Sequence, residues 1–95
     1  KMLKNLEDLI NIIRERKKNP KPSSYTNKLL NNKKLSIEKV KEEISELIES
    51  VDKNSNKIHE AADVLYHLLV YLEANNIKIE DVMKELESRK KIETE

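Results

Sequence analysis

The sequence contains no glycine and only two prolines among its 95 residues, and this limits most strongly what it can fold into. The tight turns between β-strands need residues with positive φ, and glycine is the residue that usually supplies them. A β-rich domain without glycine would therefore have few residues suited to its turns. We expect an all-α fold.

Apolar residues recur at three- and four-residue spacing along almost the whole chain, which is typical of helices. Pro20 and Pro22 end the first helix, because a proline disfavours helical backbone angles in the residue before it. A polar connector follows, with a helical turn at Thr26–Leu30, and Ser36 is a good N-cap for the second helix. The four main helices are predicted from Leu3 to about Lys17, from Ser36 to about Val51, from about Asn56 to Ala74 and from about Ile79 to Lys90.

The predicted third helix is apolar on more than one side. Val64, Val70 and Tyr71 lie outside its main apolar stripe, so the half from Val64 to Leu72 is apolar nearly all round. Such a helix is buried on several sides, and a chain of this size has little core of its own to bury it. We expect it at the centre of a homodimer or higher homo-oligomer; a central helix in a compact monomer is the alternative. The main stripe comprises Ile58, Ala61, Ala62, Leu65, Leu68, Leu69 and Leu72.

The charge and cysteine content exclude several classes of protein. Lys and Arg number 19 and Asp and Glu 18, so the net charge of +1 gives no basis for nucleic-acid binding. No cysteine is available for a disulfide, a thiolate metal site or a nucleophile. No apolar run approaches the ~20 residues of a membrane-spanning helix, and residues 1–5 lack the apolar core of a signal peptide. We expect one domain over residues 1–95, in the cytoplasm, that binds neither nucleic acid nor membrane.

Carboxylates on the second and third predicted helices are spaced so that they can converge. Glu43 and Glu46 are three residues apart, so they share one face of the second helix. Glu60 and Asp63 share one face of the third helix in the same way. At ~100° per residue, His67 falls within roughly 60° of that pair. A short turn makes the two helices an antiparallel hairpin, which could aim both acidic pairs at one point.

Converging carboxylates cannot all stay ionised unless a cation neutralises them. Magnesium prefers oxygen ligands and leaves coordination positions for water and substrate phosphates, so the spacing indicates a Mg²⁺ site. Glutamate is also common on helix surfaces, and a solvated acidic face is the alternative. Glu42 points outward, whereas Glu43 lies at the edge of the apolar stripe.

Three segments carry motifs of a known family. Residues 24–30 read SYTNKLL, like S-Y-T-x-(K/R)-L, and residues 39–46 read KVKEEISE, like K-V-G-E-E-x-x-E. Residues 60–70 read EAADVLYHLLV, like E-A-(A/S)-D-L-x-Y-H-L-L-V. Over roughly Leu3–Arg89 the chain resembles the phosphoribosyl-ATP pyrophosphohydrolases of histidine biosynthesis, within the MazG-like all-α nucleotide pyrophosphohydrolase superfamily. The family usually has glycine where Lys41 stands, and the connector is about one residue short.

This resemblance implies hydrolysis of phosphoribosyl-ATP to phosphoribosyl-AMP and pyrophosphate, the second step of histidine biosynthesis. It implies that Glu42, Glu43 or Glu46 orients or deprotonates the attacking water. It also implies Mg²⁺ as the cofactor, and the expected ligands are Glu43, Glu46, Glu60 and Asp63.

The substrate would be held by cations, hydroxyls and rings from several segments. His67 would contact the base or ribose, fix a carboxylate, or be a buried structural histidine, and these alternatives stay open. His59 is expected at the surface. The residues expected to bind the substrate are Ser24, Tyr25, Thr26, Lys28, Lys39, Tyr66, His67, Arg14 and Arg16.

Two other functions fit the same residues. A house-cleaning pyrophosphohydrolase would use the same acidic site on canonical or damaged nucleoside triphosphates, although residues 24–29 favour the histidine enzyme. A non-catalytic helical dimerisation module would bind no Mg²⁺ and would tolerate replacement of all four acids. The resemblance also makes a cyclohydrolase of the same pathway a candidate partner.

Overall fold

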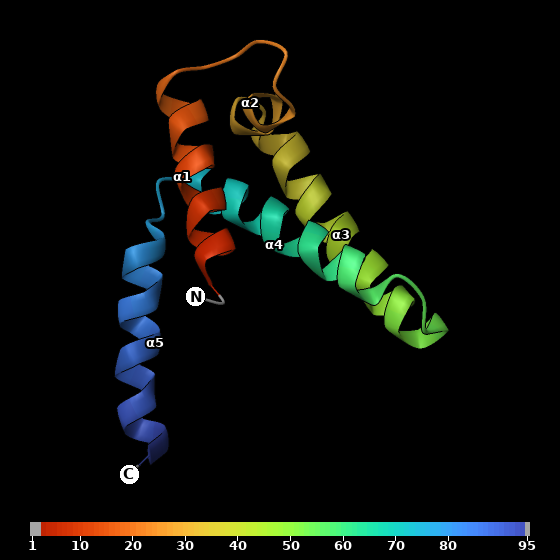
Figure 1. Cartoon of the computed structure of the whole chain (residues 1–95), viewed down its shortest axis with the longest axis vertical. Coiled ribbons are helices and arrows are strands. Elements are labelled where there is room, and N and C mark those ends of the chain that lie inside the picture. Colours follow the sequence, from red (N-terminus) through yellow and green to blue (C-terminus); the bar gives the residue numbers. More distant parts are fainter. Residues whose placement is uncertain (1–2, 95) are drawn as a thin grey trace.

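The computed structural model describes residues 3–94, and within them it contains five α-helices and no strand. Figure 1 shows α3 and α4 side by side as a long antiparallel hairpin, with α1 and α2 at the end remote from its turn. This arrangement confirms the all-α prediction, and its four long helices correspond to the four expected ones. The helices are α1 (Lys4–Lys18), α2 (Tyr25–Leu30), α3 (Lys33–Lys53), α4 (Lys57–Ala74) and α5 (Ile79–Thr94).

Asn32, and not Ser36, caps α3. The Asn32 side-chain oxygen accepts a hydrogen bond from the Leu35 backbone N–H at 3.0 Å, so the helix starts at Lys33. The predicted start at Ser36 is therefore wrong, because asparagine is as good an N-cap as serine and Asn32 precedes it. Ser36 lies one turn inside the helix and is 2% exposed.

The connector contains a six-residue helix, α2, although the sequence predicts only one helical turn there. The six residues of α2 follow Ser24, whose hydroxyl accepts a hydrogen bond from the Asn27 backbone N–H at 3.2 Å. A serine N-cap satisfies one of the free N–H groups at a helix start. As a result the segment that follows the two prolines is held in a fixed conformation rather than as an irregular loop.

At the helix ends, asparagine occupies the positive-φ positions where glycine is common in other proteins. Asn54 and Asn56, which flank the turn between α3 and α4, have φ of 54° and 55°, and Asn76 after α4 has φ of 59°. Asparagine tolerates this left-handed region better than other residues that carry a Cβ. The turns of this all-helical chain therefore need no glycine.

The buried core lies where α1, α2 and α4 meet. Ile13, Leu29, Leu69 and Val70 form it, and Leu29 and Val70 are completely buried. The expectation that Val70 lies at an interface between chains is therefore wrong, because α1 and α2 already cover that side of α4. Leu65 and Leu68 of the main stripe are instead 50% and 37% exposed.

Helix α5 extends away from the hairpin, and only its beginning lies near α1 (Figure 1). Its first turn is fixed by Arg14 of α1, which forms two hydrogen bonds with the Glu80 carboxylate at 2.8 and 2.5 Å. Farther along, Met83 and Leu86 are about half exposed, at 49% and 47%. Across residues 3–94, no helix combines the length and apolar character that a bilayer crossing would require.

Candidate active site

The acidic residues of α3 and α4 come together across the hairpin. One oxygen each from Glu43, Glu60 and Asp63 lie within 4.8 Å of one another, and so do oxygens of Glu42, Glu43 and Glu46. Glu43 belongs to both groups, so it joins them into one acidic cluster. The three-residue spacing on each helix and the antiparallel turn predicted this convergence, and the structure has it.

Glu43 is the most buried member of the cluster. It is 6% exposed, and its Oε1 atom has no hydrogen-bond partner among residues 3–94. The Oε1 atom of Glu60 is likewise buried and unpartnered there. Buried polar atoms are nearly always paired, and a buried charge without a partner is costly. A cation bound among these carboxylates would give such oxygens a partner.

Charges inside the cluster repel one another. The pKa of the Glu46 carboxyl is raised above its usual value of 4.5, chiefly by the negative charge of Glu43 and then by burial and Glu60. Carboxylates that share a site raise one another's pKa in this way. All ligand atoms in the cluster are carboxylate oxygens, which suits a hard divalent ion such as Mg²⁺.

Lys39 is a cation in direct contact with this cluster. Its Nζ atom lies 3.3 Å from Glu42 and 3.6 Å from Oε2 of Glu43. Burial acts to lower the pKa of Lys39, but the hydrogen bond and charge of Glu42 outweigh it and raise that pKa. Lys39 therefore stays protonated and balances part of the acidic charge.

Helix α2 is attached to α4 beside the acids by two side-chain hydrogen bonds. The Tyr25 hydroxyl lies 3.0 Å from Nε2 of His67, and the Thr26 hydroxyl lies 2.5 Å from the Tyr66 hydroxyl. The three rings also pack together, with Tyr66 edge-on to His67 at a centroid distance of 5.0 Å. The S-Y-T segment and the Y-H pair, expected to share a substrate site, are thus in direct contact.

His67 is buried rather than open to a cleft. It is 6% exposed, and its Nδ1 atom lies 2.8 Å from the backbone oxygen of Asp63. Of the alternatives for this residue, the structure favours a buried, hydrogen-bonded histidine that contacts the backbone of a cluster residue and not its carboxylate. Replacing it will therefore cost packing as well as polar contacts.

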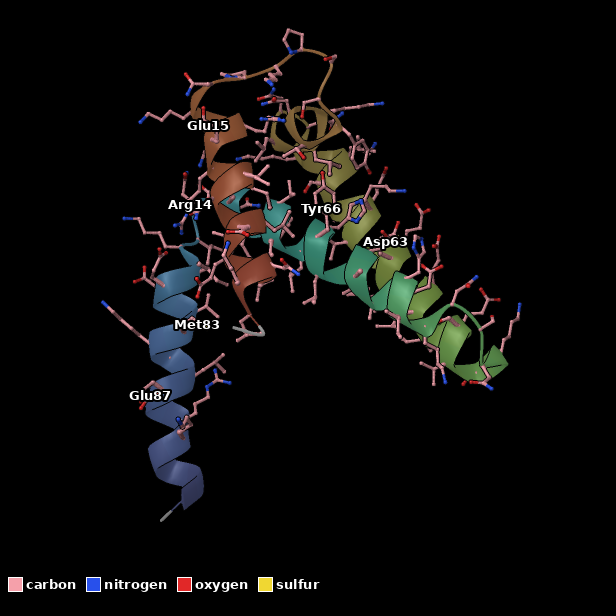
Figure 2. All side chains as sticks on the ribbon, viewed as in Figure 1. Arg14, Glu15, Asp63, Tyr66, Met83 and Glu87 are labelled. Atoms are coloured by element: carbon pink, nitrogen blue, oxygen red, sulfur yellow. The ribbon has the colours of Figure 1, made fainter. Side chains whose placement is uncertain are left out.

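The remaining predicted substrate residues occupy different places. Lys28 is exposed and, with Ser24 and Tyr25, lines an open depression beside the connector. Arg14 is engaged with Glu73 and Glu80, and Figure 2 shows it at the junction of α1 and α5, apart from Asp63. The backbone oxygen of Arg16 accepts a hydrogen bond from Asn27. The structure does not bring Arg14 to the acidic cluster.

Sequence reasoning missed two residues near the site. Asn27 is 4% exposed, and its side chain bonds the Lys21 N–H and the Arg16 oxygen, both at 2.8 Å. It thereby holds the connector against α2, and no local pattern signals this. His59 is exposed, as expected, but its Nε2 lies 3.3 Å from Asp63. Their four-residue spacing on one helix could have indicated that contact.

Comparison with known proteins agrees with the motifs. A sequence model of the phosphoribosyl-ATP pyrophosphohydrolase family matches residues 6–90. The phosphoribosyl-ATP pyrophosphatase of Clostridium acetobutylicum is 46% identical over 89 residues, which cover 88% of this chain and 79% of the relative. Those of Clostridium novyi and Bacillus cereus are 42% identical over 91 residues and 43% identical over 84. Those matches cover 90% and 85% of this chain and 81% and 78% of the relatives. The chain belongs to the phosphoribosyl-ATP pyrophosphohydrolase family.

Proposed function

We propose that this chain hydrolyses phosphoribosyl-ATP to phosphoribosyl-AMP and pyrophosphate, the second step of histidine biosynthesis, and that it depends on Mg²⁺. As a member of this family it is a hydrolase that acts on a phosphoanhydride, and its close relatives carry the name phosphoribosyl-ATP pyrophosphatase. The observation that carries the proposal is that Glu43 belongs to both groups of carboxylates and has a buried Oε1 without a hydrogen-bond partner among the described residues.

Glu43, Glu46, Glu60 and Asp63 are the proposed Mg²⁺ ligands. Their oxygens are hard ligands, and the unpartnered oxygens of Glu43 and Glu60 support this assignment. When bound, the ion would neutralise negative charge on the substrate phosphates. Glu42 is exposed at the edge of the cluster and remains available to orient or deprotonate the attacking water.

Lysines near the cluster are suited to the phosphates that the acids would otherwise repel. Lys39 already contacts Glu42 and Glu43 of the acidic cluster, with 26% of its side chain exposed. Lys28 borders the neighbouring depression. Positioned cations stabilise the charge that develops during phosphoryl transfer, so Lys39 and Lys28 are the proposed phosphate ligands.

A second copy of the chain is the proposed partner. Ile44 and Ile48 of α3 and Leu65 and Leu68 of α4 are 42%, 59%, 50% and 37% exposed. At ~100° per residue, these side chains lie on the side of the hairpin opposite the acidic cluster. Pairing this side with its own copy by two-fold symmetry gives a four-helix bundle and leaves the acids open.

The decisive experiment compares the turnover of phosphoribosyl-ATP, ATP and dCTP by the purified chain with and without Mg²⁺. We expect phosphoribosyl-ATP to be preferred and turnover to stop when EDTA removes the metal. Glu43→Gln should lower kcat at least about 100-fold, because it removes a charged ligand from the cluster, while helical content by circular dichroism stays unchanged.

Glu49→Gln is the matched control, because Glu49 is an exposed residue of α3 paired with Lys53. It should turn over the substrate like the unmodified chain. Preference for ATP or dCTP would favour the house-cleaning activity instead. Absence of any turnover, with no Mg²⁺ binding by calorimetry, would leave the non-catalytic dimerisation module as the better description.

A further inference from the structure

The hydrogen bonds of His67 define where its ring proton lies. Nδ1 is 2.8 Å from the backbone oxygen of Asp63. A carbonyl oxygen can only accept a hydrogen bond, so Nδ1 must carry the proton and donate it. This bond also ties the ring to the backbone of a residue in the acidic cluster.

The other ring nitrogen then determines the role of Tyr25. In a neutral imidazole with the proton on Nδ1, Nε2 is an acceptor. Tyr25 lies 3.0 Å from Nε2, so in this tautomer its hydroxyl is the donor and Nε2 of His67 is the acceptor. Edge-on contacts with Tyr66 and Tyr25, at 76–84° between ring planes, hold the imidazole in this orientation.

We infer that His67 is a positioning residue that fixes the Tyr25 hydroxyl as a hydrogen-bond acceptor toward the substrate. The Tyr25 hydroxyl donates its only proton to His67, so only the lone pairs of its oxygen remain for other partners. This inference rests on the proposed function for its substrate, but the proton position on His67 does not. Tyr25 therefore contacts the substrate with its hydroxyl in an orientation that His67 of α4 sets.

An acceptor at this place selects the groups that it can contact. A phosphate oxygen would be repelled by the Tyr25 lone pairs, whereas an ammonium, a ribose hydroxyl or a base amino group would be bound. The Lys39 ammonium is close enough that its charge acts to lower the pKa of Tyr25, against the larger upward effect of burial. Tyr25 thus supports Lys39 or a donor group of the nucleoside, and Lys39 and Lys28 are left to contact phosphate.

The first test reads the proton position directly. Long-range ¹⁵N–¹H NMR of the metal-free chain distinguishes protonated from unprotonated ring nitrogens, and the His59→Gln variant assigns the two histidines. We expect His67 to have a protonated Nδ1 and an unprotonated Nε2 at neutral pH. A protonated Nε2, with or without a proton on Nδ1, would overturn the inference, because Tyr25 would then be free to donate to the substrate.

The second test is a double-mutant cycle on turnover of phosphoribosyl-ATP. Tyr25→Phe and His67→Leu should each lower kcat/KM about tenfold, which is about 1.4 kcal/mol, mainly through KM. If His67 acts through Tyr25, the double variant should be no worse than either single variant. Losses that add in the double variant would show that His67 does not act through Tyr25. Tyr71→Phe is the control, since Tyr71 lies on α4 outside the site, and it should match the unmodified chain.

Rescue separates the bond to Tyr25 from simple packing. The His67→Gln amide can reach the Tyr25 hydroxyl and should keep kcat/KM within about threefold of the unmodified chain. His67→Asn is too short to reach it and should show the full loss. Equal activity of these two variants, at matched folded fractions, would contradict the positioning role. An unmodified chain that does not hydrolyse phosphoribosyl-ATP would contradict the proposed function, and the NMR result would still decide the proton position.

Discussion

Among single residues, Glu46 shows how charge repulsion within the acidic cluster lowers the stability of the folded chain. Its carboxyl has a pKa raised above 4.5, chiefly by the Glu43 charge. Such a group binds more protons in the folded than in the unfolded chain, so its contribution to the free energy of unfolding falls as pH rises from 4.5 through the raised pKa. At neutral pH the metal-free chain therefore holds a carboxylate that destabilises it, and a bound cation would reverse this effect.

Glu46→Gln should therefore stabilise the metal-free chain while removing its response to metal. We expect its Tm at pH 7 without metal to rise, because the repulsion from Glu43 is lost, although solvent around Glu46 screens part of this effect. Added Mg²⁺ should raise the Tm of the unmodified chain but not that of the variant. Differential scanning calorimetry measures both, and Glu49→Gln should behave like the unmodified chain. A full Mg²⁺ response in Glu46→Gln would remove Glu46 from the ligand set.

At the scale of helices, the sequence predicts most of what local spacing determines. The long helices follow from apolar periodicity, and the acidic cluster follows from the three-residue spacing on α3 and α4. The predicted start of α3 at Ser36 differs from the observed start because Asn32 and Ser36 are equivalent as N-caps from sequence alone. The Tyr25–His67 hydrogen bond could not be predicted, because it joins residues 42 positions apart and depends on how α2 packs on α4. The contacts of the Asn27 side chain could not be predicted either, because no local pattern signals them.

The same limit explains the error on α4. Its sequence shows that apolar residues surround the helix, but not which neighbour covers which side. Val70 faces α1 and α2 and is fully buried, whereas Leu65 of the main stripe is 50% exposed. Among the described residues, α4 still has more apolar surface than the rest of the chain covers. The exposed part includes Leu65 and Leu68, and it does not include Val70.

Helix α5 is held to the rest of the chain by an ion pair at its first turn. The hydrogen bonds from Arg14 lower the pKa of Glu80 to about 2, from its ordinary value of 4.5. A carboxyl with a lowered folded pKa stabilises the fold above pH 4.5, and this contribution is lost as pH falls from 4.5 toward 2. Glu80 is well exposed, at 59% of its side chain, so solvent screens much of the effect.

Glu80→Gln should therefore weaken the pH dependence of stability and the attachment of α5. The fall in the free energy of unfolding between pH 5 and pH 2 should be smaller than in the unmodified chain, measured by urea denaturation. Hydrogen exchange of α5 amides should be faster at pH 7. Glu87→Gln, on the exposed face of the same helix, is the control and should change neither. An unchanged α5 exchange rate in Glu80→Gln would show that other contacts hold this helix.

For the whole molecule, the hairpin has two sides of opposite character. From the spacing of ~100° per residue, one side carries the acidic cluster and the other carries exposed isoleucine and leucine side chains of both helices. A small single chain buries only part of its apolar surface, and exposed apolar patches of this kind mark interaction sites. Because the two sides are separate, a second copy can cover the apolar side without covering the acids.

This separation predicts that the dimer and the acidic cluster can be disrupted independently. The unmodified chain should have twice the mass of one 11.2 kDa chain by light scattering at micromolar concentration. The double variant Ile48→Glu and Leu65→Glu should be monomeric, because each buried aliphatic side chain contributes about 1.5–3 kcal/mol and the new charges would repel across the two-fold axis. Met83→Glu is the matched control: Met83 is 49% exposed but lies on α5, so this variant should stay dimeric. If Met83→Glu dissociates the dimer and the hairpin variant does not, the interface lies on α5, and the exposed side of α3 and α4 needs another partner.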